Sequence, residues 1–292
     1  VVILGQLAPS VVFTPSAGFA AELVPTEAHT LNALIAAVED RIPEEDSEKY
    51  VVPAETVLAE IRLAVTAMLN GDPVVLGDSL QAHYAAVDFF DIEDGQVYQV
   101  LVETVDGDDD GVSDRGWGTV IINGAGTAID LCIGIPHPLF DGDTPAQGID
   151  VFKGVNARTF LMSGTHRNAN AQLAPVFDSS SYRIGDAAHN VQHGFFAAYQ
   201  AIYDDYTTSG VDFIAIQLHG MSEASSNGLE VYATHGVTRV PTTGSLVRQL
   251  QDQLRSLSVD WDVAVPGDPV TANLSGTLNV EGRLLNGIRE DA

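Results

Sequence analysis

The spacing of apolar residues predicts helices in the N-terminal third of the chain. Leu31, Leu34 and Ile35 recur at intervals of three and four residues, which places them on one face of a helix. The same spacing predicts a second helix over residues 54–69, and the acidic stretch between the two is expected to be a solvated loop. We therefore expect residues 1–95 to form a helical N-terminal extension or subdomain, which could also pack as an accessory layer on the remainder.

From about residue 98 the pattern changes to short apolar runs that alternate with amphipathic segments. The expected strands are residues 98–103, 118–122, 128–135, 159–162, 213–218 and 262–265. The expected helices are residues 145–155, 187–206 and 245–257. Such alternation predicts an α/β protein, a three-layer α/β/α arrangement with a mixed, mainly parallel sheet. Residues 96–292 are expected to form the catalytic domain.

The charge of the chain excludes several kinds of partner. Its net charge is −27, from 40 acidic and 13 basic side chains in 292 residues. Sequence-independent binding to nucleic acid or to an anionic membrane needs Lys and Arg facing phosphate groups, so neither is expected. No segment approaches 18 consecutive apolar residues, and we expect no membrane insertion. A hydrophobic content of 45% nevertheless indicates a substantial buried core.

Lysine is nearly absent, with only Lys49 and Lys153 in the chain. This bias indicates either adaptation to high salt or an extracellular, calcium-rich setting, because dissolved cations screen the repulsion between carboxylates. The protein is accordingly expected to be secreted or extracellular, or to work in the cytoplasm of a halophile. The chain as given shows no signal peptide, which leaves a removed one open. The single cysteine, Cys132, lies in an apolar run and is expected to be a buried structural thiol.

Polar residues follow three of the predicted strands at the points where they end. His137 comes after one strand, His166 and Arg167 after the next, and His219 after a third. In an open α/β sheet, residues just past the carboxyl ends of the strands line the ligand crevice. The pattern therefore predicts one site built by all three strand ends.

The first and third of these strand ends predict a zinc site. Two imidazoles from His137 and His219, with one carboxylate, are a usual protein share of catalytic zinc coordination and leave a position open for water. Asp141 and Asp143 both compete for the carboxylate position, and we favour Asp141. The alternative is an ordinary turn in an acidic protein, with a structural histidine at a strand end.

The second strand end carries groups suited to substrate. The fork of Arg167 fits a substrate carboxylate or a developing oxyanion, and Asn168 adds a neutral donor. We expect Arg167 and His166 to take part in catalysis and Asn168 to contact substrate. A surface ion pair is the alternative for Arg167.

Two further segments complete the candidate site. His189 and His193 are spaced as in zinc proteases, but without the glutamate of that motif, so His189 is expected to contact substrate. Glu281 is the candidate general base, and Arg283 a candidate substrate contact. A purely structural Glu–Arg contact is the alternative for this pair.

An acidic loop predicts a separate, structural calcium site. Asp106, Asp108, Asp110 and Asp114 occupy positions 1, 3, 5 and 9 of a calcium-loop pattern, with a glycine at position 6. Position 12 is Trp117 rather than glutamate, so the loop is not a complete EF-hand. An acidic hairpin tip without an ion is the alternative.

With these residues in view, the last two-thirds of the chain resembles the zinc carboxypeptidase-like hydrolases. Within that group it is most similar to the N-formylglutamate amidohydrolase and poly-γ-glutamate hydrolase branches. The resemblance is one of order and context, and three strand ends carry it. They are Ile135-Pro136-His137, Thr165-His166-Arg167-Asn168 and Leu218-His219-Gly220.

The resemblance implies a mixed sheet between helices and one zinc ion, with hydrolysis of an amide bond near a carboxylate. Carried over by position, His137, Asp141 and His219 would hold zinc, Arg167 would bind substrate carboxylate or polarise the carbonyl, and Glu281 would be the general base. The chain departs from the pattern at Phe140, where the carboxypeptidases have glutamate three residues after the first histidine. The resemblance therefore supports the carboxylate ligand less than the two histidine ligands.

Three functions remain open from the sequence. The leading hypothesis is a zinc-dependent hydrolase of a peptide or N-acyl amino acid, acting through metal-activated water on a small-molecule or peptide substrate. An esterase or deacylase would use the same metal site, and the absence of a Gly-x-Ser-x-Gly motif disfavours a serine hydrolase. The third is a non-catalytic, calcium-stabilised secreted or surface protein with a hydrolase-like fold. The sequence leaves the oligomeric state open.

Overall fold

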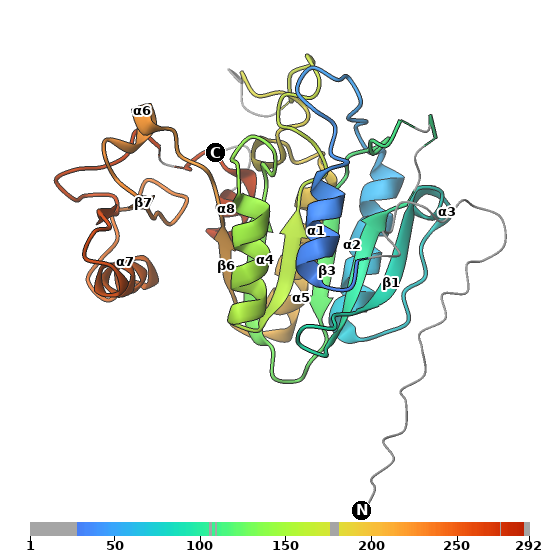
Figure 1. The fold of residues 1–292 in the computed structure, drawn as a ribbon, viewed down its shortest axis with the longest axis horizontal. Helices are drawn as coiled ribbons and strands as arrows, with labels where there is room; N and C mark the ends of the chain where they lie inside the picture. Colours follow the sequence, from blue (N-terminus) through green and yellow to red (C-terminus); the bar gives the residue numbers. More distant parts are fainter. Residues whose placement is uncertain (1–27, 105–106, 109, 176–180, 275, 289–292) are drawn as a thin grey trace, which may run out of the picture.

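The computed structural model describes residues 28–104, 107–108, 110–175, 181–274 and 276–288. Its centre is a six-stranded sheet in the order β1-β2-β3-β5-β4-β6 (Figure 1). The strands are β1 (Tyr84–Phe90), β2 (Val97–Glu103), β3 (Thr119–Asn123), β4 (Ile129–Ile135), β5 (Ala157–Met162) and β6 (Ile214–Gln217). β4 pairs in parallel with both β5 and β6. The pairs β1–β2, β2–β3 and β3–β5 are antiparallel. Only β1 and β3 therefore run against the common direction.

Helices cover both faces of this sheet, which confirms the predicted three-layer α/β/α class. α1 (Leu31–Glu39) and α4 (Thr144–Gly154) pack together on one face, and α2 (Glu55–Asn70) and α5 (Gly194–Ser209) on the other. The central strands β3, β4 and β5 are buried on both sides along most of their length. In β4, Ile133 and Ile135 belong to the cluster under α1 and α4, while Cys132 belongs to the cluster under α2 and α5. Because successive side chains of a strand point to opposite faces of the sheet, β4 contributes to both cores.

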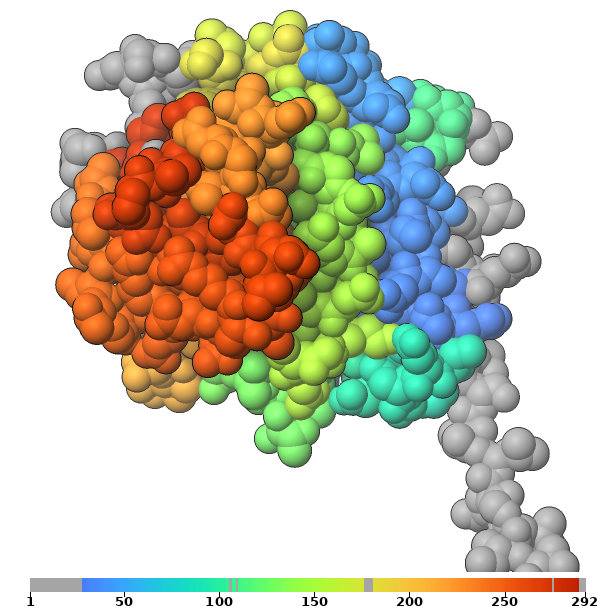
Figure 2. Space-filling model, turned by 60° about the vertical axis from the view of Figure 1, so that its left-hand side comes forward, coloured from blue at the N-terminus to red at the C-terminus, as the bar shows by residue number. Residues whose placement is uncertain are grey.

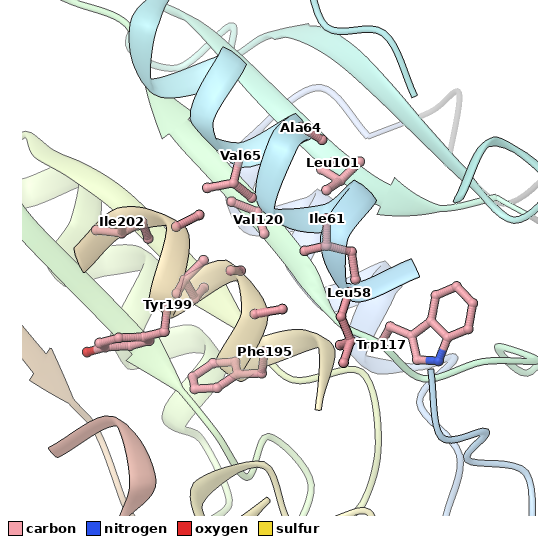
Figure 3. Close-up of a cluster of buried hydrophobic side chains, with 14 of the residues drawn as sticks. Leu58, Ile61, Ala64, Val65, Leu101, Trp117, Val120, Phe195, Tyr199 and Ile202 are labelled. Atoms are coloured by element: carbon pink, nitrogen blue, oxygen red, sulfur yellow. The ribbon is translucent and has the colours of Figure 1, made fainter. Parts of the chain in front are cut away.

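The larger core lies between the sheet and the pair α2 and α5. Figure 3 shows Leu58, Ile61 and Val65 of α2 directed toward the face that α5 shares, with Phe195 and Tyr199 of α5 beside them. The apolar spacing of three and four that predicted α2 therefore matches its buried face. Cys132 is buried in the same cluster, as expected for a structural thiol, and burial raises its pKa to about 11.

The N-terminal part supplies a strand as well as helices. β1 was not among the predicted strands, yet it pairs with β2 along seven residues at the edge of the sheet. Its sequence, Tyr84 to Phe90, contains two alanines and an aspartate, so it shows little of the alternation or β-branched content that indicates a strand. Residues 28–90 thus share the hydrophobic clusters of the following segment.

The predicted helix over residues 187–206 is wrong over its first seven residues. A 3₁₀ turn, η1 (Ala187–His189), comes first, and α5 begins only at Gly194. The break is held by side chains, because Asn190 donates to the carbonyl of Ile184 at 2.7 Å and His193 accepts from the N–H of Phe195 as the N-cap. His189 and His193 therefore do not share a helix face, and the expected protease-like spacing is not realised.

A lobe projects from the edge of the sheet beyond β6 (Figure 1), and we use this name for residues 221–274. It contains α6 (Glu223–Ser226), β7 (Val231–Tyr232), α7 (Leu246–Leu257) and β8 (Val263–Ala264). The strand predicted at residues 262–265 is β8, but it pairs with β7 in a sheet of its own. The chain then returns to the main body through α8 (Val280–Leu285), which packs against α5.

The remaining helix, α3 (Asp78–Gln81), is a single turn before β1. In the described part of the chain, no helix combines the length and the apolar character that crossing a membrane requires.

Candidate metal centre

The candidate centre lies where the parallel strands end. β4, β5 and β6 run in the same direction, so His137, Arg167 and His219 leave the same edge of the sheet. The chain goes from β4 to α4 on one face and from β5 through η1 to α5 on the other. Connections that leave adjacent strands toward opposite faces open a crevice between them, the usual ligand position in such sheets.

The first group of side chains is the one that the sequence predicted. Oδ2 of Asp141 lies 3.1 Å from Nδ1 of His137 and 3.0 Å from Nδ1 of His219. The two imidazole centroids are 5.0 Å apart, and the three possible ligand atoms all lie within 4.8 Å of one another. Asp141, and not Asp143, is the carboxylate beside both imidazoles.

A second carboxylate holds the other side of His137. Nε2 of His137 and Nδ1 of His189 each lie 2.9 Å from Oδ1 of Asp186, and the guanidinium of Arg167 pairs with Oδ2. Tyr182 stacks on His189 with ring centroids 3.6 Å apart. Asp186 is buried and thus ties the predicted metal ligand to the predicted substrate arginine.

The charges in this cluster stabilise one another. Burial lowers the pKa of His137, but hydrogen bonds to Asp141 and Asp186 outweigh it and leave the pKa raised. Burial likewise raises the pKa of Asp141, yet its bonds with His137 and His219 hold that pKa below the usual range. In the absence of an ion, the two carboxylates therefore favour the protonated form of His137.

The first group fits a small divalent cation. Two imidazole nitrogens and one carboxylate oxygen are a donor set that zinc uses in proteins, and the three atoms lie within 4.8 Å of one another. With Nε2 of His137 donating a hydrogen bond to Asp186, the lone pair of Nδ1 would face Asp141 and be available to an ion. His219 is partly exposed, which leaves one side of the group accessible.

The other possible ligand group suits a cation less well. Among the described residues, His137, Asp186 and His189 form the one further set with suitable spacing. Its carboxylate already pairs with Arg167, so a second positive charge there would be repelled. We therefore assign Asp186 and His189 to the support of His137 rather than to an ion.

Glu281 lies fully buried at the start of α8. Gln217, the last residue of β6, donates to its Oε2 at 3.2 Å, while Oε1 has no partner. Burial raises the pKa of Glu281 to about 8, and the nearby charges of His137 and Asp186 also act on it. A carboxyl group with such a pKa beside a metal group suits a general base.

The structure places the other predicted residues around this centre with different partners. His166 accepts at Nδ1 from the backbone N–H of Asn168 at 3.1 Å, and its ring meets Phe140 edge-on. The side chain of Asn168 donates to Glu45 at 3.0 Å. Arg283 lies in the last turn of α8, and neither it nor His166 belongs to the two ligand groups.

Asp186 is the residue that sequence reasoning missed. It is one of many aspartates in an acidic chain, and it follows no strand directly. The only signal is its place three residues before His189, the histidine that it holds. Spacing alone could not connect it with His137, which lies 49 residues earlier.

The predicted calcium loop falls partly outside the described residues, because Asp106 is not among them. Asp108 and Asp110 both pair with Lys49, and Asp114 accepts from the N–H of Gly107 at 2.8 Å. A lysine thus supplies the positive charge beside two of the expected ligands. Calcium binding at this loop stays a prediction.

No protein-family model, curated protein or solved structure matches this chain. What the centre can do is therefore inferred from its own side chains.

Gly220 is the position where a small change should disturb the centre most selectively. A Cβ atom there would lie 2.6 Å from the carbonyl oxygen of Asp141 and 2.9 Å from its Cα. We expect Gly220→Ala to push His219 away from Asp141 and to weaken zinc affinity roughly 10–100-fold, as for other changes just outside a metal site. Gly124→Ala, which meets nothing within 4 Å, is the matched control. Zinc titration with a chromophoric competitor measures both, and equal affinities would contradict the expected strain.

Proposed function

We propose that this chain is a zinc-dependent hydrolase that cleaves an amide bond in a peptide or N-acyl amino acid carrying a carboxylate. The observation that supports it best is the convergence of His137, Asp141 and His219 at the ends of β4 and β6. A site of this kind joined to Arg167 through Asp186, with Glu281 close by, has the parts that metal-assisted hydrolysis requires.

His137, Asp141 and His219 would hold the ion, and zinc in such a site acidifies a coordinated water molecule and polarises a carbonyl oxygen. Asp186 fixes the ring of His137, so that Nδ1 faces the other two ligands. The buried part of the group keeps bulk water away from one side, and the partly exposed His219 marks the side open to substrate.

Arg167 is positioned to bind the substrate. Asp186 engages its guanidinium, and the same group lies 4.9 Å from the ring centroid of Phe140. Held at two places, the guanidinium can present its remaining N–H groups to a substrate carboxylate or to the negative charge that develops on the carbonyl oxygen. Phe140 is half exposed and provides an apolar surface beside it.

Glu281 is the proposed general base. Its unpartnered Oε1 can accept a proton from the attacking water and later deliver it to the leaving amine. Gln217 holds Oε2 and is itself held by Asn279 at 2.5 Å, so the amide that orients the carboxyl group is fixed in turn. An ester would react through the same tetrahedral geometry, and amide and ester substrates are therefore to be compared directly.

Metal analysis of protein purified without added metal tests this function. We expect about one zinc per chain, loss of hydrolysis of N-acyl amino acids or short acidic peptides on chelation, and recovery on adding zinc back. Mass spectrometry with inductively coupled plasma gives the metal content. Calcium alone, with hydrolysis unaffected by a zinc chelator, would contradict the proposal and favour a calcium-stabilised, non-catalytic protein.

A further inference from the structure

The helix α7 of the lobe packs with its polar side inward. Gln251 is its one fully buried residue, and the side-chain amide donates to the carbonyl of Val263 at 2.9 Å. Arg255 donates to the same carbonyl at 3.0 Å, and Arg248 pairs with Asp268 at 2.5 Å. These bonds fix the rotation of the helix, because each polar group would lose its partner if the helix turned over.

The opposite side of α7 carries a stripe of leucines. Leu246, Leu250, Leu254 and Leu257 recur at intervals of four, four and three, so they lie on one face. Leu246 is 57% exposed, Leu250 40% and Leu257 77%. We call these four residues the leucine stripe. Its spacing is that of helices which pair through a narrow apolar seam.

The apolar surface continues beyond the helix. Val259 and Trp261, just after α7, are 95% and 44% exposed. In Figure 2 the lobe comes forward, and the orange-red surface that includes α7 is not covered by other segments of the described chain. A contiguous apolar surface of this kind usually marks a site of protein association.

Charge indicates which partner fits this surface. The lobe, residues 221–274, has six acidic and three basic side chains, a net charge of −3, which leaves −24 of the total −27 for the rest of the chain. Gln249 and Gln253, which border the leucine stripe, are exposed and uncharged. Two copies of this acidic chain would therefore repel each other less through the lobe than through the rest of the surface, although Asp260 and Asp262 flank Trp261.

We propose that the chain forms a symmetric dimer through the leucine stripe, with the stripe of a second copy as its partner. A two-fold interface needs only one self-complementary patch. With the two helices antiparallel and centred near Asp252, Leu250 of each copy meets Leu254 of the other, and uncharged glutamines lie along the seam. Asp252 is on the far side of the helix from the stripe, so the two carboxylates do not oppose each other.

The contact area that a stable dimer needs favours an interface between two whole lobes over one between two α7 helices alone. A stable interface buries about 800 Å² per partner, and a 12-residue helix is only about 18 Å long. Val259 and Trp261, which are exposed and follow α7 in the sequence, would enlarge the contact. Neither lies among the proposed metal ligands, so the dimer does not depend on the proposed activity.

Sedimentation equilibrium over a range of protein concentrations tests the dimer. We expect the wild type to be dimeric and Leu250→Glu and Leu257→Glu each to weaken association at least tenfold. Leu63→Glu, at a leucine of α2 that is 69% exposed, is the matched control and should leave the dimer intact. Raising the salt concentration should strengthen the wild-type dimer, because it screens the repulsion between two chains of charge −27.

The mutated leucines are exposed, so folding is expected to persist, and circular dichroism of each variant checks it. A wild type that stays monomeric at every concentration and salt level would overturn the proposal. So would a dimer that both lobe variants leave unchanged. If the wild type is monomeric while hydrogen exchange shows the amides of α7 strongly protected, the lobe folds onto its own chain, and the second copy is not the partner.

Discussion

His137→Ala is expected to remove both bound zinc and hydrolysis. His137 is the buried side chain on which the two halves of the centre converge, with Asp141 at Nδ1 and Asp186 at Nε2. Without its ring, only Asp141 and His219 remain as ligands, one fewer than the three protein ligands of catalytic zinc sites. Metal content and turnover of the same preparation measure the two losses together.

His189→Ala distinguishes between the two groups of possible ligands in this region. If the ion lies with Asp141 and His219, His189 supports it only through Asp186, and its loss should weaken zinc affinity by a factor of roughly 10–100 or less. Zinc lost as completely as with His137→Ala would instead place the ion with Asp186. Zinc retained at full occupancy in His137→Ala would contradict the centre altogether.

The sequence predicted the layers because its apolar patterns coincide with buried faces. The strands that become β4 and β5 are mainly apolar and are buried along most of their length. The helix that becomes α4 was predicted to within one residue at each end. β1 was not predicted, because it is an edge strand in which small and charged residues interrupt the alternation of apolar and polar positions. Tertiary pairing with β2, and not local preference, makes it a strand.

The two histidines of the proposed metal site could also be predicted from the sequence, because each lies two residues after the end of a strand. His137 and His219 leave parallel neighbours, and the shared direction of β4 and β6 brings their side chains together. Asp186 was not accessible, because its position depends on the long connection between β5 and α5. That connection is held by side-chain bonds such as those of Asn190 and Arg183 to backbone carbonyls. No repeating pattern in the local sequence indicates such contacts.

The lobe is inserted between two residues of the proposed site. His219 lies two residues before it, and Glu281 lies seven residues after it on α8. The segment that leaves the sheet is fixed by the close contact of Gly220 with Asp141, and the segment that returns is fixed by Asn279 on Gln217. These anchors hold the site residues in place from the main body, so the stripe on α7 can bind a second copy without displacing them.

Glu281→Gln is expected to lower kcat/KM by roughly 10²–10⁴-fold, the usual contribution of a general base, while zinc stays bound. The amide keeps nearly the same shape and can still bond with Gln217, but it cannot accept a proton from water. In the wild type, activity should rise with pH as Glu281 loses its proton. Its pKa is about 8 because of burial, and a bound cation would shift the rise to lower pH.

The same substitution should have the opposite effect on stability. Since the pKa of Glu281 is raised from 4.5 to about 8 on folding, the stability that it contributes is complete below pH 4.5 and is lost as the pH rises toward 8. The metal-free Glu281→Gln protein carries no such charge and should unfold at a higher temperature than the metal-free wild type at pH 9, with little difference at pH 5. Activity lost together with stability at both pH values would indicate a structural glutamate and would contradict the role as base. Activity lost with stability gained at high pH is the result expected of a buried carboxylate that is retained for catalysis.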